Sequence, residues 1–435
     1  MSLNKKVAFH TLGCKVNQYE TESIKNQLSK LGYAEVPFEE IADIYIINSC
    51  TVTSIADKKT RNMLRRAKKN NKNSIVILTG CYAETNSKDL EEIDEIDYIV
   101  GNKDKQGIVN LIKDIENEKE SSRVINESIF VQKEYEEYEI ATLREMSRAY
   151  VKIQDGCNSF CSYCKIPFAR GKSRSRKIEN IIDEIEKIVE QGYKEIILIG
   201  INIGAYGEDL EEKLTLENLV KKIVEINGVE RIRFGSIYPD RIRDEFIELF
   251  KNPKVLPHIH LSLQSGDDTI LKAMKRKYDS ELIKSRCTKI KKEIKNLEFT
   301  ADVIVGFPGE TDEMHKNTYE TIKSIGFIDL HIFQYSDREG TLASTFSNKV
   351  DIKTKKFRAD DLENLRVEMF NDIAKKYIGE TLETLIEENL KGDSVGHTTN
   401  YLKVKVLSNI MKIGQIYSLK IIDFKDGVLI GEERN

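Results

Sequence analysis

The stretch Gly156–Gly171 reads GCNSFCSYCKIPFARG and places three cysteines in a Cys-x3-Cys-x2-Cys arrangement. These cysteines are Cys157, Cys161 and Cys164. Thiolates this close can bind three irons of a cubane cluster and leave the fourth iron open. A closed structural zinc site would require four protein ligands, and the sequence offers no fourth cysteine nearby. The stretch therefore favours an iron–sulfur cluster with one exchangeable corner, and a zinc knuckle is the alternative.

Around this stretch, residues 146–373 alternate strand and helix signals, which predicts a parallel sheet with helical crossovers. Six strands in this order suggest a partial (βα)6 barrel whose site lies at the carboxyl ends of the strands. The predicted strands are Ala149–Ile153, Glu195–Ile199, Arg231–Ser236, His258–Leu263, Phe299–Val305 and His331–Tyr335, and the predicted helices are Ile178–Glu190, Leu216–Ile226, Arg241–Phe250, Glu281–Ile294 and Thr311–Ile325.

Upstream, residues 1–117 predict a second parallel α/β domain. Cys14, Cys50 and Cys81 each follow one of its strands, and ligands gather at the carboxyl ends of strands in such sheets. We expect the three thiols to converge on a second metal cluster, although three unrelated buried cysteines are the simpler alternative. The predicted strands are Val7–His10, Ile44–Asn48, Ile75–Thr79 and Tyr98–Val100, and the predicted helices are Glu20–Leu31, Ser54–Lys69 and Asp104–Ile115.

The remaining segments complete a mixed α/β architecture. Residues 118–145 are rich in charge without clear periodicity, which indicates a linker with an edge strand at most. Residues 354–377 form the pattern of one long amphipathic helix. From Gly379 the pattern changes to period two, which predicts a small antiparallel β-barrel. The expected domains are thus 1–117, the linker 118–145, 146–373 and 374–435.

Composition bounds the class of protein. The chain has 435 residues, of which 40% are hydrophobic and 32% charged, as in soluble proteins of two or three domains. No apolar run could span a membrane, and the start lacks a secretory pattern. Seven cysteines then indicate reduced thiols in the cytoplasm. Six can be ligands, and Cys287 is predicted to be structural.

The net charge of −4 does not by itself indicate a nucleic-acid-binding protein. Basic residues nevertheless gather in Lys58–Lys72, in Lys165–Lys177, and in a third region formed by Lys272–Lys277 and Lys284–Lys295. Such local patches can contact phosphates even in an acidic protein, although each could also be a solvated helix face.

The Cys-x3-Cys-x2-Cys arrangement, with Tyr163 before the last cysteine, resembles the radical S-adenosylmethionine (radical SAM) enzymes. Three later strand ends resemble the SAM-binding positions of that family: ILIGIN (Ile197–Asn202), SLQSG (Ser262–Gly266) and VIVGFPGET (Val303–Thr311). The resemblance implies that a cluster on Cys157, Cys161 and Cys164 is catalytic and cleaves SAM to a 5'-deoxyadenosyl radical. It implies SAM contacts at Tyr163, Gly200, Asn202, Ser236, Gln264, Ser265, Val305 and Gly306.

Over nearly the whole chain, the resemblance narrows to the methylthiotransferases. In that family an N-terminal domain with three cluster cysteines precedes the radical SAM core and a C-terminal TRAM barrel, which VGHTTNYLKVKV (Val395–Val406) resembles. The segments TLGCKVNQYE, NSCTVTSIADKKTRNMLRRA and TGCYAE are most similar to the branch that modifies threonylcarbamoyladenosine at position 37 of tRNA. Ser49, Asp337 and Lys165 depart from the family pattern, but none replaces a cluster ligand.

The resemblance implies two [4Fe-4S] clusters, with Cys14, Cys50 and Cys81 holding the one that carries the sulfur, and a second SAM that donates the methyl group. It also implies three partners: the tRNA anticodon loop, an electron donor such as flavodoxin or ferredoxin, and a sulfur donor. The alternatives are a methylthiotransferase acting on isopentenyladenosine tRNA or on a ribosomal protein, and a non-enzymatic metal-dependent RNA-binding protein. The predicted RNA contacts are Arg65, Arg66, Arg174, Arg176, Lys403 and Lys405.

Overall fold

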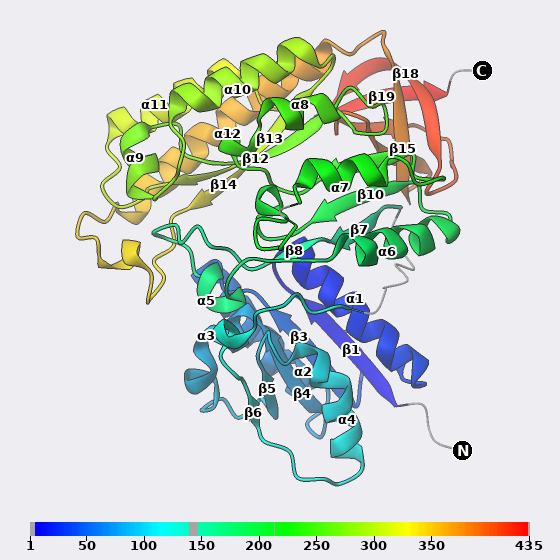
Figure 1. The fold of residues 1–435 in the computed structure, drawn as a ribbon, viewed down its shortest axis with the longest axis vertical. Coiled ribbons are helices and arrows are strands. Elements are labelled where there is room, and N and C mark those ends of the chain that lie inside the picture. The colour runs from blue at the N-terminus through cyan, green and yellow to red at the C-terminus, as the bar shows by residue number, and fades with distance from the viewer. Residues whose placement is uncertain (1–4, 139–146, 213, 434–435) are drawn as a thin grey trace. The chain divides into compact units, whose positions relative to one another are not determined.

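A computed structural model describes residues 5–138, 147–212 and 214–433 (Figure 1). The chain folds as two compact units. The first comprises Met1–Leu143, Lys152–Arg176 and Ser336–Ser344, and the second comprises Arg144–Val151, Lys177–Tyr335 and Thr345–Asn435. The cysteine loop thus folds with the N-terminal region. The domain boundaries expected from the sequence stay predictions, and residues 139–146 of the expected linker lie outside the described residues.

The first unit is built on a six-stranded parallel sheet with the order β2-β1-β3-β4-β5-β6. Residues of β3 alternate between its two faces: Ile44 and Ile46 belong to one apolar cluster, and Tyr45 and Ile47 to the other. This alternation is what a sheet covered on both faces requires. The strands are β1 (Lys6–Thr11), β2 (Ala34–Glu35), β3 (Ile44–Ser49), β4 (Ile75–Gly80), β5 (Tyr98–Val100) and β6 (Val124–Ile125).

Helices cover both faces of this sheet (Figure 1). Leu64 and Ala67 of α2 pack in one cluster, whereas Ile24, Leu28 and Ile108 of α1 and α4 pack in the other. The two-residue strand β6 pairs with β5 at the edge of the sheet, as anticipated for the segment after residue 118. The helices are α1 (Lys15–Lys30), α2 (Ser54–Asn70), α3 (Cys81–Leu90), α4 (Ile108–Glu116) and α5 (Ile166–Arg170), and the 3-10 turns are η1 (Lys105–Gly107) and η2 (Ile129–Val131).

Two predictions for this unit were wrong in detail. Helix α1 begins at Lys15 rather than Glu20, directly after Cys14. The apolar pattern of a helix is weak there because Asn17, Glu20, Thr21 and Ser23 are buried polar residues on its inner face. Helix α3 was not predicted at all, because its ten residues open on CYAETN, which has little apolar periodicity.

The second unit contains six strands in two three-stranded parallel sheets, β11-β10-β7 and β12-β13-β14. An isolated parallel bridge between Ile237 and Leu261 links the two sheets, which gives the six strands one continuous order. This arrangement confirms the predicted partial barrel. Its strands do not form one continuous sheet, because the pairing between β11 and β12 is reduced to isolated bridges. The strands are β7 (Ala149–Lys152), β10 (Glu195–Ile199), β11 (Arg231–Phe234), β12 (His258–Gln264), β13 (Glu298–Val305) and β14 (Asp329–Gln334).

Crossover helices connect these strands (Figure 1). Most start with a side-chain cap, as at Thr215, Asp279, Thr311 and Asp351, whose oxygens accept backbone N–H groups of the first turn. The helices are α6 (Ile178–Glu190), α7 (Leu216–Ile223), α8 (Asp244–Leu249), α9 (Asp268–Ala273), α10 (Ser280–Glu293), α11 (Asp312–Ile325) and α12 (Ile352–Lys375), and the 3-10 turns are η3 (Ile203–Ala205), η4 (Pro239–Arg241) and η5 (Leu342–Thr345).

The C-terminal residues form a closed barrel with the order β15-β16-β17-β19-β18. The prediction of an antiparallel barrel holds for four of its ladders, but β17 and β19 pair in parallel. The barrel core includes Ile373 and Ala374 in the last turn of α12 and Tyr377 just after that helix. The strands are β15 (Thr381–Leu390), β16 (Asp393–Thr398), β17 (Lys403–Val406), β18 (Ile416–Lys425) and β19 (Val428–Glu433).

Buried arginines fix the barrel to the strands of the second unit. Arg233 on β11 donates to the carbonyl oxygens of Thr398 and Thr399, at 2.7 and 2.9 Å, and to Glu195 on β10 at 2.7 Å.

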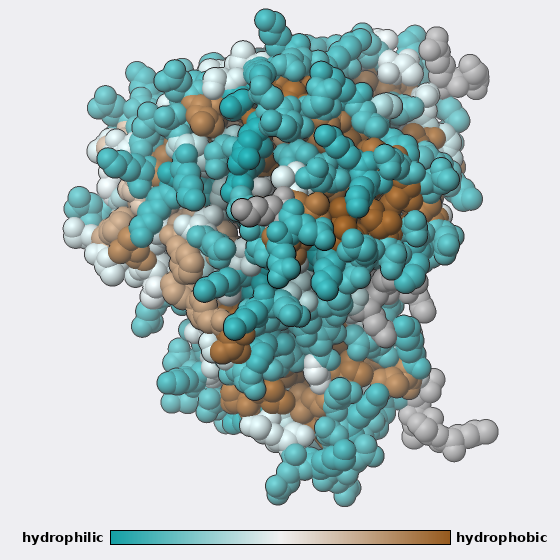
Figure 2. Space-filling model, viewed as in Figure 1, coloured by the Kyte–Doolittle hydropathy of each residue, from teal (hydrophilic) through white to brown (hydrophobic). Residues whose placement is uncertain are grey.

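Hydrophilic side chains cover most of the visible surface (Figure 2). Among the described residues, no helix is long and apolar enough to cross a membrane.

Candidate metal-cluster site

Cys14, Cys50 and Cys81 lie at the carboxyl ends of three adjacent strands, β1, β3 and β4. The turn that carries Cys14 lies directly against Cys50: a Cβ at Gly13 would fall 2.8 Å from the Cys50 Cβ and 2.9 Å from its Sγ. Gly13 also has a φ of 101°, which a side chain would strain. The backbone of the turn therefore requires glycine to bring the first thiol beside the second.

The third thiol is placed by a hydrogen bond between strands. Ser49, at the end of β3, donates its hydroxyl to the Thr79 carbonyl at 2.5 Å and accepts from the Tyr82 N–H at 3.2 Å. This accepted bond satisfies an N–H in the first turn of α3, the turn that Cys81 opens. Ser49 was noted as a departure from the family pattern, and the structure gives it a role in seating Cys81.

The three thiols affect one another electrostatically. Burial, together with the neighbouring Cys81 and Cys14 thiols, raises the pKa of the Cys50 thiol to about 12. Burial also raises the pKa of Cys81, with the Arg170 charge acting against it and Cys14 adding to it. Thiols in this state hold their protons until a metal displaces them. The three thiols therefore lie at one edge of the sheet and influence one another, and their binding of a cluster stays a prediction.

The second set of thiols lies in the loop of Cys157, Cys161 and Cys164. The Cys157 N–H donates to the Gly171 carbonyl at 3.1 Å, and the Cys164 N–H to that of Cys161 at 3.0 Å. The Ser159 N–H points at the Cys157 Sγ at 3.4 Å, a contact of the kind that tunes iron–sulfur clusters. Phe160 sits at a φ of 44°, a left-handed conformation uncommon outside glycine. The loop backbone therefore takes an uncommon turn between Cys157 and Cys161.

Both cysteine sets belong to the first unit. Three groups of contacts, which we call ties, connect the residues near Cys81, Cys50 and Cys14 to the loop of Cys157, Cys161 and Cys164 or to the segments next to it. The first tie is at Cys81. Asn102, which follows β5, donates to the Ala169 carbonyl at 2.7 Å and lies 3.8 Å from the Cys81 Sγ. One amide group therefore contacts both a thiol of the first set and the helix α5 that follows the second.

The second tie is at Cys50 and comes from the segment Ser336–Ser344. Arg338 donates to the Thr51 hydroxyl at 2.7 Å and to the Asp57 carboxylate at 2.6 Å. In the same segment, the Ala343 N–H donates to the Ser162 carbonyl, between two core cysteines, at 2.7 Å. This segment therefore contacts the loop after Cys50 at one end and the core cysteine loop at the other.

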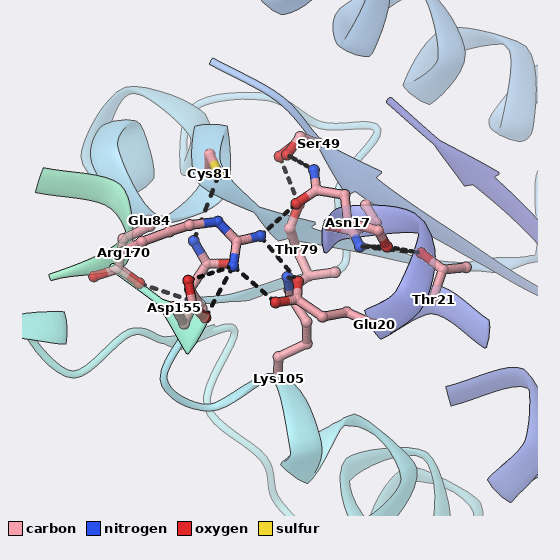
Figure 3. Close-up of polar contacts among 12 residues, drawn as sticks. Asn17, Glu20, Thr21, Ser49, Thr79, Cys81, Glu84, Lys105, Asp155 and Arg170 are labelled. Atoms are coloured by element: carbon pink, nitrogen blue, oxygen red, sulfur yellow. Dashed lines mark hydrogen bonds and ion pairs between the residues drawn. The ribbon is translucent and has the colours of Figure 1, made fainter. Parts of the chain in front are cut away.

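The third tie is at Cys14 and consists of buried charges (Figure 3). Arg170 on α5 donates to Asn17 at 2.5 Å and to both oxygens of Glu20, all on α1. It also pairs with Asp155 at 3.0 Å, just before Cys157. Lys105 completes the cluster by pairing with Glu20 at 2.5 Å.

The charges of this cluster keep its carboxylates ionised. Burial acts to raise the pKa of Glu20, but Arg170, Lys105 and Lys152 hold it well below its usual value. The pKa of Asp155 is likewise lowered, because Arg170 and Lys152 outweigh its burial. Lys152 donates to both carboxylates at 2.7 Å. Five charged side chains thus lie together inside the protein, where charges are costly unless fully paired.

The predicted SAM contacts of the second unit lie where the sequence placed them along the chain. Gly200 and Asn202 follow β10, Ser236 follows β11, and Gln264 ends β12. Gln264 has a φ of 67°, a strained conformation of the kind found at binding sites. The remaining predicted contacts are Ser265 after β12, Val305 and Gly306 at the end of β13, and Tyr163, which belongs to the first unit.

Two of these residues make hydrogen bonds to other segments of the second unit. Ser265 is fully buried, and its hydroxyl contacts that of Thr318 on α11 at 3.1 Å. Gly306 has a φ of 71°, and its N–H donates to Glu310 at 2.6 Å. Their contribution to SAM binding stays a prediction.

The predicted RNA contacts divide into two groups. Arg65 and Arg66 are exposed on α2, and Lys403 is exposed on β17, while Lys405 pairs with Asp393 at 2.7 Å. Arg174 and Arg176 are buried.

The buried pair supports the cysteine loop from within. Arg174 donates to the carbonyl oxygens of Arg170 and Lys172, at 2.9 and 2.8 Å, and Arg176 pairs with Glu137 at 2.6 Å. Their placement gives no support to the prediction that they contact phosphate, because a buried, paired guanidinium cannot reach a ligand at the surface.

Neither set of thiols forms a single-ion site. Among the described residues, the one group whose ligand atoms all lie within 4.8 Å of one another is His260, Asp302 and His331, on β12, β13 and β14. Cysteine thiols spaced more widely than this suit a polynuclear cluster better than one zinc ion. Cys287, the seventh cysteine, is buried on α10, and burial raises its pKa to about 12, in agreement with a structural role.

Sequence reasoning missed the residues that join the two cysteine sets. Arg170 and Asn17 stand inside segments that were quoted for their cysteines, FARG and TLGCKVN, but a charged residue is ordinarily expected at the surface. Lys105, Asn102 and Arg338 carry no local signal, because their partners are distant in sequence. The residues missed are Asn17, Glu20, Asn102, Lys105, Lys152, Asp155, Arg170 and Arg338.

Comparison with known families divides the chain into two matched regions. Residues 6–101 match the family described as "Uncharacterized protein family UPF0004". Residues 151–322 match the radical SAM superfamily.

Curated relatives match almost the full chain. "Threonylcarbamoyladenosine tRNA methylthiotransferase MtaB" of Bacillus subtilis is 41% identical over 422 residues, which cover 96% of this chain and 93% of the relative. The protein of the same name from Thermotoga maritima is 35% identical, with 96% and 94% covered. "tRNA-2-methylthio-N(6)-dimethylallyladenosine synthase" of Clostridium botulinum is 36% identical, with 97% and 96% covered.

A solved structure shares the fold at low identity. The radical S-adenosylmethionine methyltransferase TsrM from Kitasatospora setae, solved with cobalamin and a [4Fe-4S] cluster, aligns with a TM-score of 0.59 and 13% identity. The alignment covers 90% of this chain and 81% of that one. At this identity the likeness concerns the fold alone.

Proposed function

Because this chain belongs to the radical SAM methylthiotransferases, we propose that it places a methylthio group on carbon 2 of threonylcarbamoyladenosine at position 37 of tRNA. The relatives named for this reaction reach 41% identity, whereas those named for the dimethylallyladenosine reaction reach 36%. The difference in identity favours the threonylcarbamoyl substrate. The dimethylallyl substrate is therefore the second candidate.

The observation that carries the proposal is the presence of two three-cysteine sets in one compact unit. Each set leaves one corner of a [4Fe-4S] cluster without a protein ligand. When bound, the clusters and SAM supply the radical chemistry that replaces an unactivated aromatic C–H bond. A reaction that joins a radical to a stored sulfur requires both sets at one site, and a single cluster would not need the second set.

The residues of the chain hold and orient these groups. Cys157, Cys161 and Cys164 would bind the cluster that contacts SAM, and Cys14, Cys50 and Cys81 the cluster that carries sulfur. Asn102 and the segment Ser336–Ser344 keep the two sets at a fixed separation through the contacts described above. Fixed separation matters because a radical reacts before a mobile partner could arrive.

The RNA would be held by exposed basic residues, of which Arg65, Arg66 and Lys403 are accessible. The target base must leave the stacked anticodon loop to be reached, as in other enzymes that act on a base. We place the reaction in the cytoplasm, where tRNA is modified, and expect a flavodoxin or ferredoxin to supply electrons and a separate donor to supply sulfur.

The test is a reaction of the anaerobically reconstituted protein with three anticodon stem-loops, followed by mass spectrometry of the nucleosides. The stem-loops carry threonylcarbamoyladenosine, dimethylallyladenosine or unmodified adenosine at the same position. The proposal predicts a methylthio product from the first alone. Product from the second alone would transfer the assignment to the dimethylallyl branch, and product from neither would overturn the proposed function.

A further inference from the structure

Arg170 contacts residues next to both cysteine sets (Figure 3), as does Lys152 through Glu20 and Asp155. It lies on α5, six residues after Cys164, and is 1% exposed. One edge of its guanidinium group reaches Asn17 and Glu20 on α1, which begins directly after Cys14. Its Nη1 also pairs with Asp155, which precedes the core loop. A planar guanidinium can span such partners with fixed geometry, whereas a lysine ammonium cannot.

The position of Asn17 extends this contact into the first cysteine set. Its Nδ2 donates to the carbonyl oxygens of Leu12 and Ser49, at 2.8 and 3.0 Å. Leu12 lies in the turn before Cys14, and Ser49 immediately precedes Cys50. Through Asn17, Arg170 is therefore connected to the backbone that orients two of the three thiols.

The cluster of charges around Arg170 has an excess of positive charge. Arg170, Lys105 and Lys152 are cations, and their paired anions are Glu20 and Asp155. Two further charges lie at its border: Arg174 is 3.8 Å from Asp155, and Glu136 faces Lys152 with its pKa raised by burial to about 7, so that it is partly neutral. Two carboxylates thus face three fully buried cations.

This positive charge acts on the third thiol. The Asn102 amide lies 3.8 Å from the Cys81 Sγ and donates to the carbonyl oxygen of Ala169, so that α5 passes beside this thiol immediately before Arg170. Lys105 and Glu20 belong to the same buried cluster as Arg170. A nearby cation stabilises added negative charge, so it also raises the potential at which a bound cluster accepts an electron. The effect is large in a buried site, because little water screens it.

Stability alone does not account for such an arrangement. A buried network of ion pairs is often no more stable than a well-packed apolar group of the same volume. Such a network is expected where its charges position a neighbouring segment or change the electrostatic potential at a neighbouring group. We propose that Arg170 is a positioning residue that holds the Cys14 loop against the core cysteine loop and raises the reduction potential of the cluster on Cys14, Cys50 and Cys81. The inference rests on the proposed function in requiring a cluster on those thiols.

The experiment measures this potential by redox titration monitored with electron paramagnetic resonance. The reporter is the full-length protein in which Cys157, Cys161 and Cys164 are alanine, so that the remaining signal comes from the other cluster. Arg170→Met removes the charge and keeps the length of the side chain. Glu20→Gln removes the opposing charge. Arg358→Met removes another buried, ion-paired arginine, in the second unit, and is the matched control.

The inference predicts opposite shifts. The potential falls in Arg170→Met, rises in Glu20→Gln and is unchanged in Arg358→Met. Arg170→Lys keeps the positive charge but loses the planar guanidinium group. Its cluster therefore keeps a reduction potential close to that of the reporter protein without this substitution. In the otherwise wild-type enzyme, Arg170→Lys forms product more slowly while SAM binding is unchanged. A purely structural role would lower iron content in all three Arg170 and Glu20 variants without moving the potential in opposite directions.

If Arg170→Met does not retain its cluster, Lys105→Met replaces it in the redox titration. Lys105 is a cation of the same buried cluster as Arg170 and lies on a different element, so its replacement also lowers the potential. Shifts of the same sign in the Glu20 and Lys105 variants, or no shift in either, would overturn the inference. Absence of methylthio product from the wild-type enzyme, with these opposite shifts intact, would instead overturn the proposed function and leave the inference standing.

Discussion

The two cysteine sets are built in opposite ways. Cys157, Cys161 and Cys164 lie in one short loop, whereas Cys14, Cys50 and Cys81 come from the ends of three strands. A loop needs only its own turns to gather its thiols. The strand-end set needs the whole sheet to fold, and also Gly13, Ser49 and the register of three strands. The first set is thus locally encoded, and the second depends on tertiary structure.

The largest expected effects separate the roles of the two sets. Cys161→Ala and Cys81→Ala each remove about half of the iron, because each disables one of two four-iron clusters. Both abolish the methylthio product. Only Cys161→Ala abolishes reductive cleavage of SAM, which is measured as 5'-deoxyadenosine by chromatography.

One control and one contradicting outcome frame this result. Cys287→Ala, a buried cysteine outside both sets, keeps all of the iron and the activity. Continued formation of 5'-deoxyadenosine in Cys161→Ala would contradict the division of roles.

The dependence of the strand-end set on tertiary contacts is tested by Arg338→Met. This change leaves the buried Asp57 carboxylate without its cation, and breaking such a pair costs about 3–5 kcal/mol of unfolding free energy. Iron bound by the Cys14 set falls with stability, while iron bound by the core loop is retained. Denaturant unfolding and iron analysis measure the two effects. Arg366→Met, which removes a partly exposed pair, costs less than about 1 kcal/mol.

The helix that carries Cys81 gives a prediction of pH dependence. Glu84 on α3 accepts the N–H groups of Asn102 and Ile129, and burial raises its pKa to about 7. Because the folded pKa lies above the unfolded one, the contribution of Glu84 to stability is full below the unfolded pKa and is lost as pH rises toward about 7. Glu84→Gln removes this dependence and at neutral pH stabilises the fold by at most about 3 kcal/mol.

Denaturant unfolding of both proteins between about pH 5 and pH 8 checks this prediction. A difference between wild type and Glu84→Gln that stays constant across the range would show that Glu84 titrates normally. Glu136 has a similarly raised pKa, so the variant keeps part of the pH dependence.

The smallest expected effect lies outside both sets. Lys403→Ala on the C-terminal barrel lowers tRNA affinity and reduces the slope of log affinity against log salt by about 0.9, as expected for one lost phosphate contact. Lys405→Ala, in which the lysine is already paired with Asp393, changes the slope less. Point variants are preferable to removing the barrel, because its core is shared with Ile373 of α12 and with Tyr377 just after that helix. An unchanged slope in Lys403→Ala would exclude this residue from the RNA surface.

The difference between the sets also explains what the sequence could predict. Spacing alone identified the core cysteines, and the strand periodicity placed Cys14, Cys50 and Cys81 at one sheet edge. The six strands of the partial barrel were predicted close to their observed bounds, since buried parallel strands are continuous apolar runs. These features depend on local pattern.

The contacts that join the sets could not be predicted in the same way. Arg174 and Arg176 were predicted to contact RNA because they stand in a basic run close after the core cysteines, but the structure buries both. Arg170, Glu20 and Lys105 are also buried, and each is stabilised by partners distant in sequence. The sequence around a charged residue does not show which distant residue will pair with it. Buried polar networks are therefore the part of this site that only the structure reveals.

Iron and sulfide analysis of the reconstituted wild-type protein tests the central claim most directly. If the local loop and the strand-end set each hold a four-iron cluster, the protein contains about eight irons per chain, of which about four remain when Cys14, Cys50 and Cys81 are replaced. A wild-type protein that saturates at about four irons, all lost with the core cysteines, would contradict the two-cluster site.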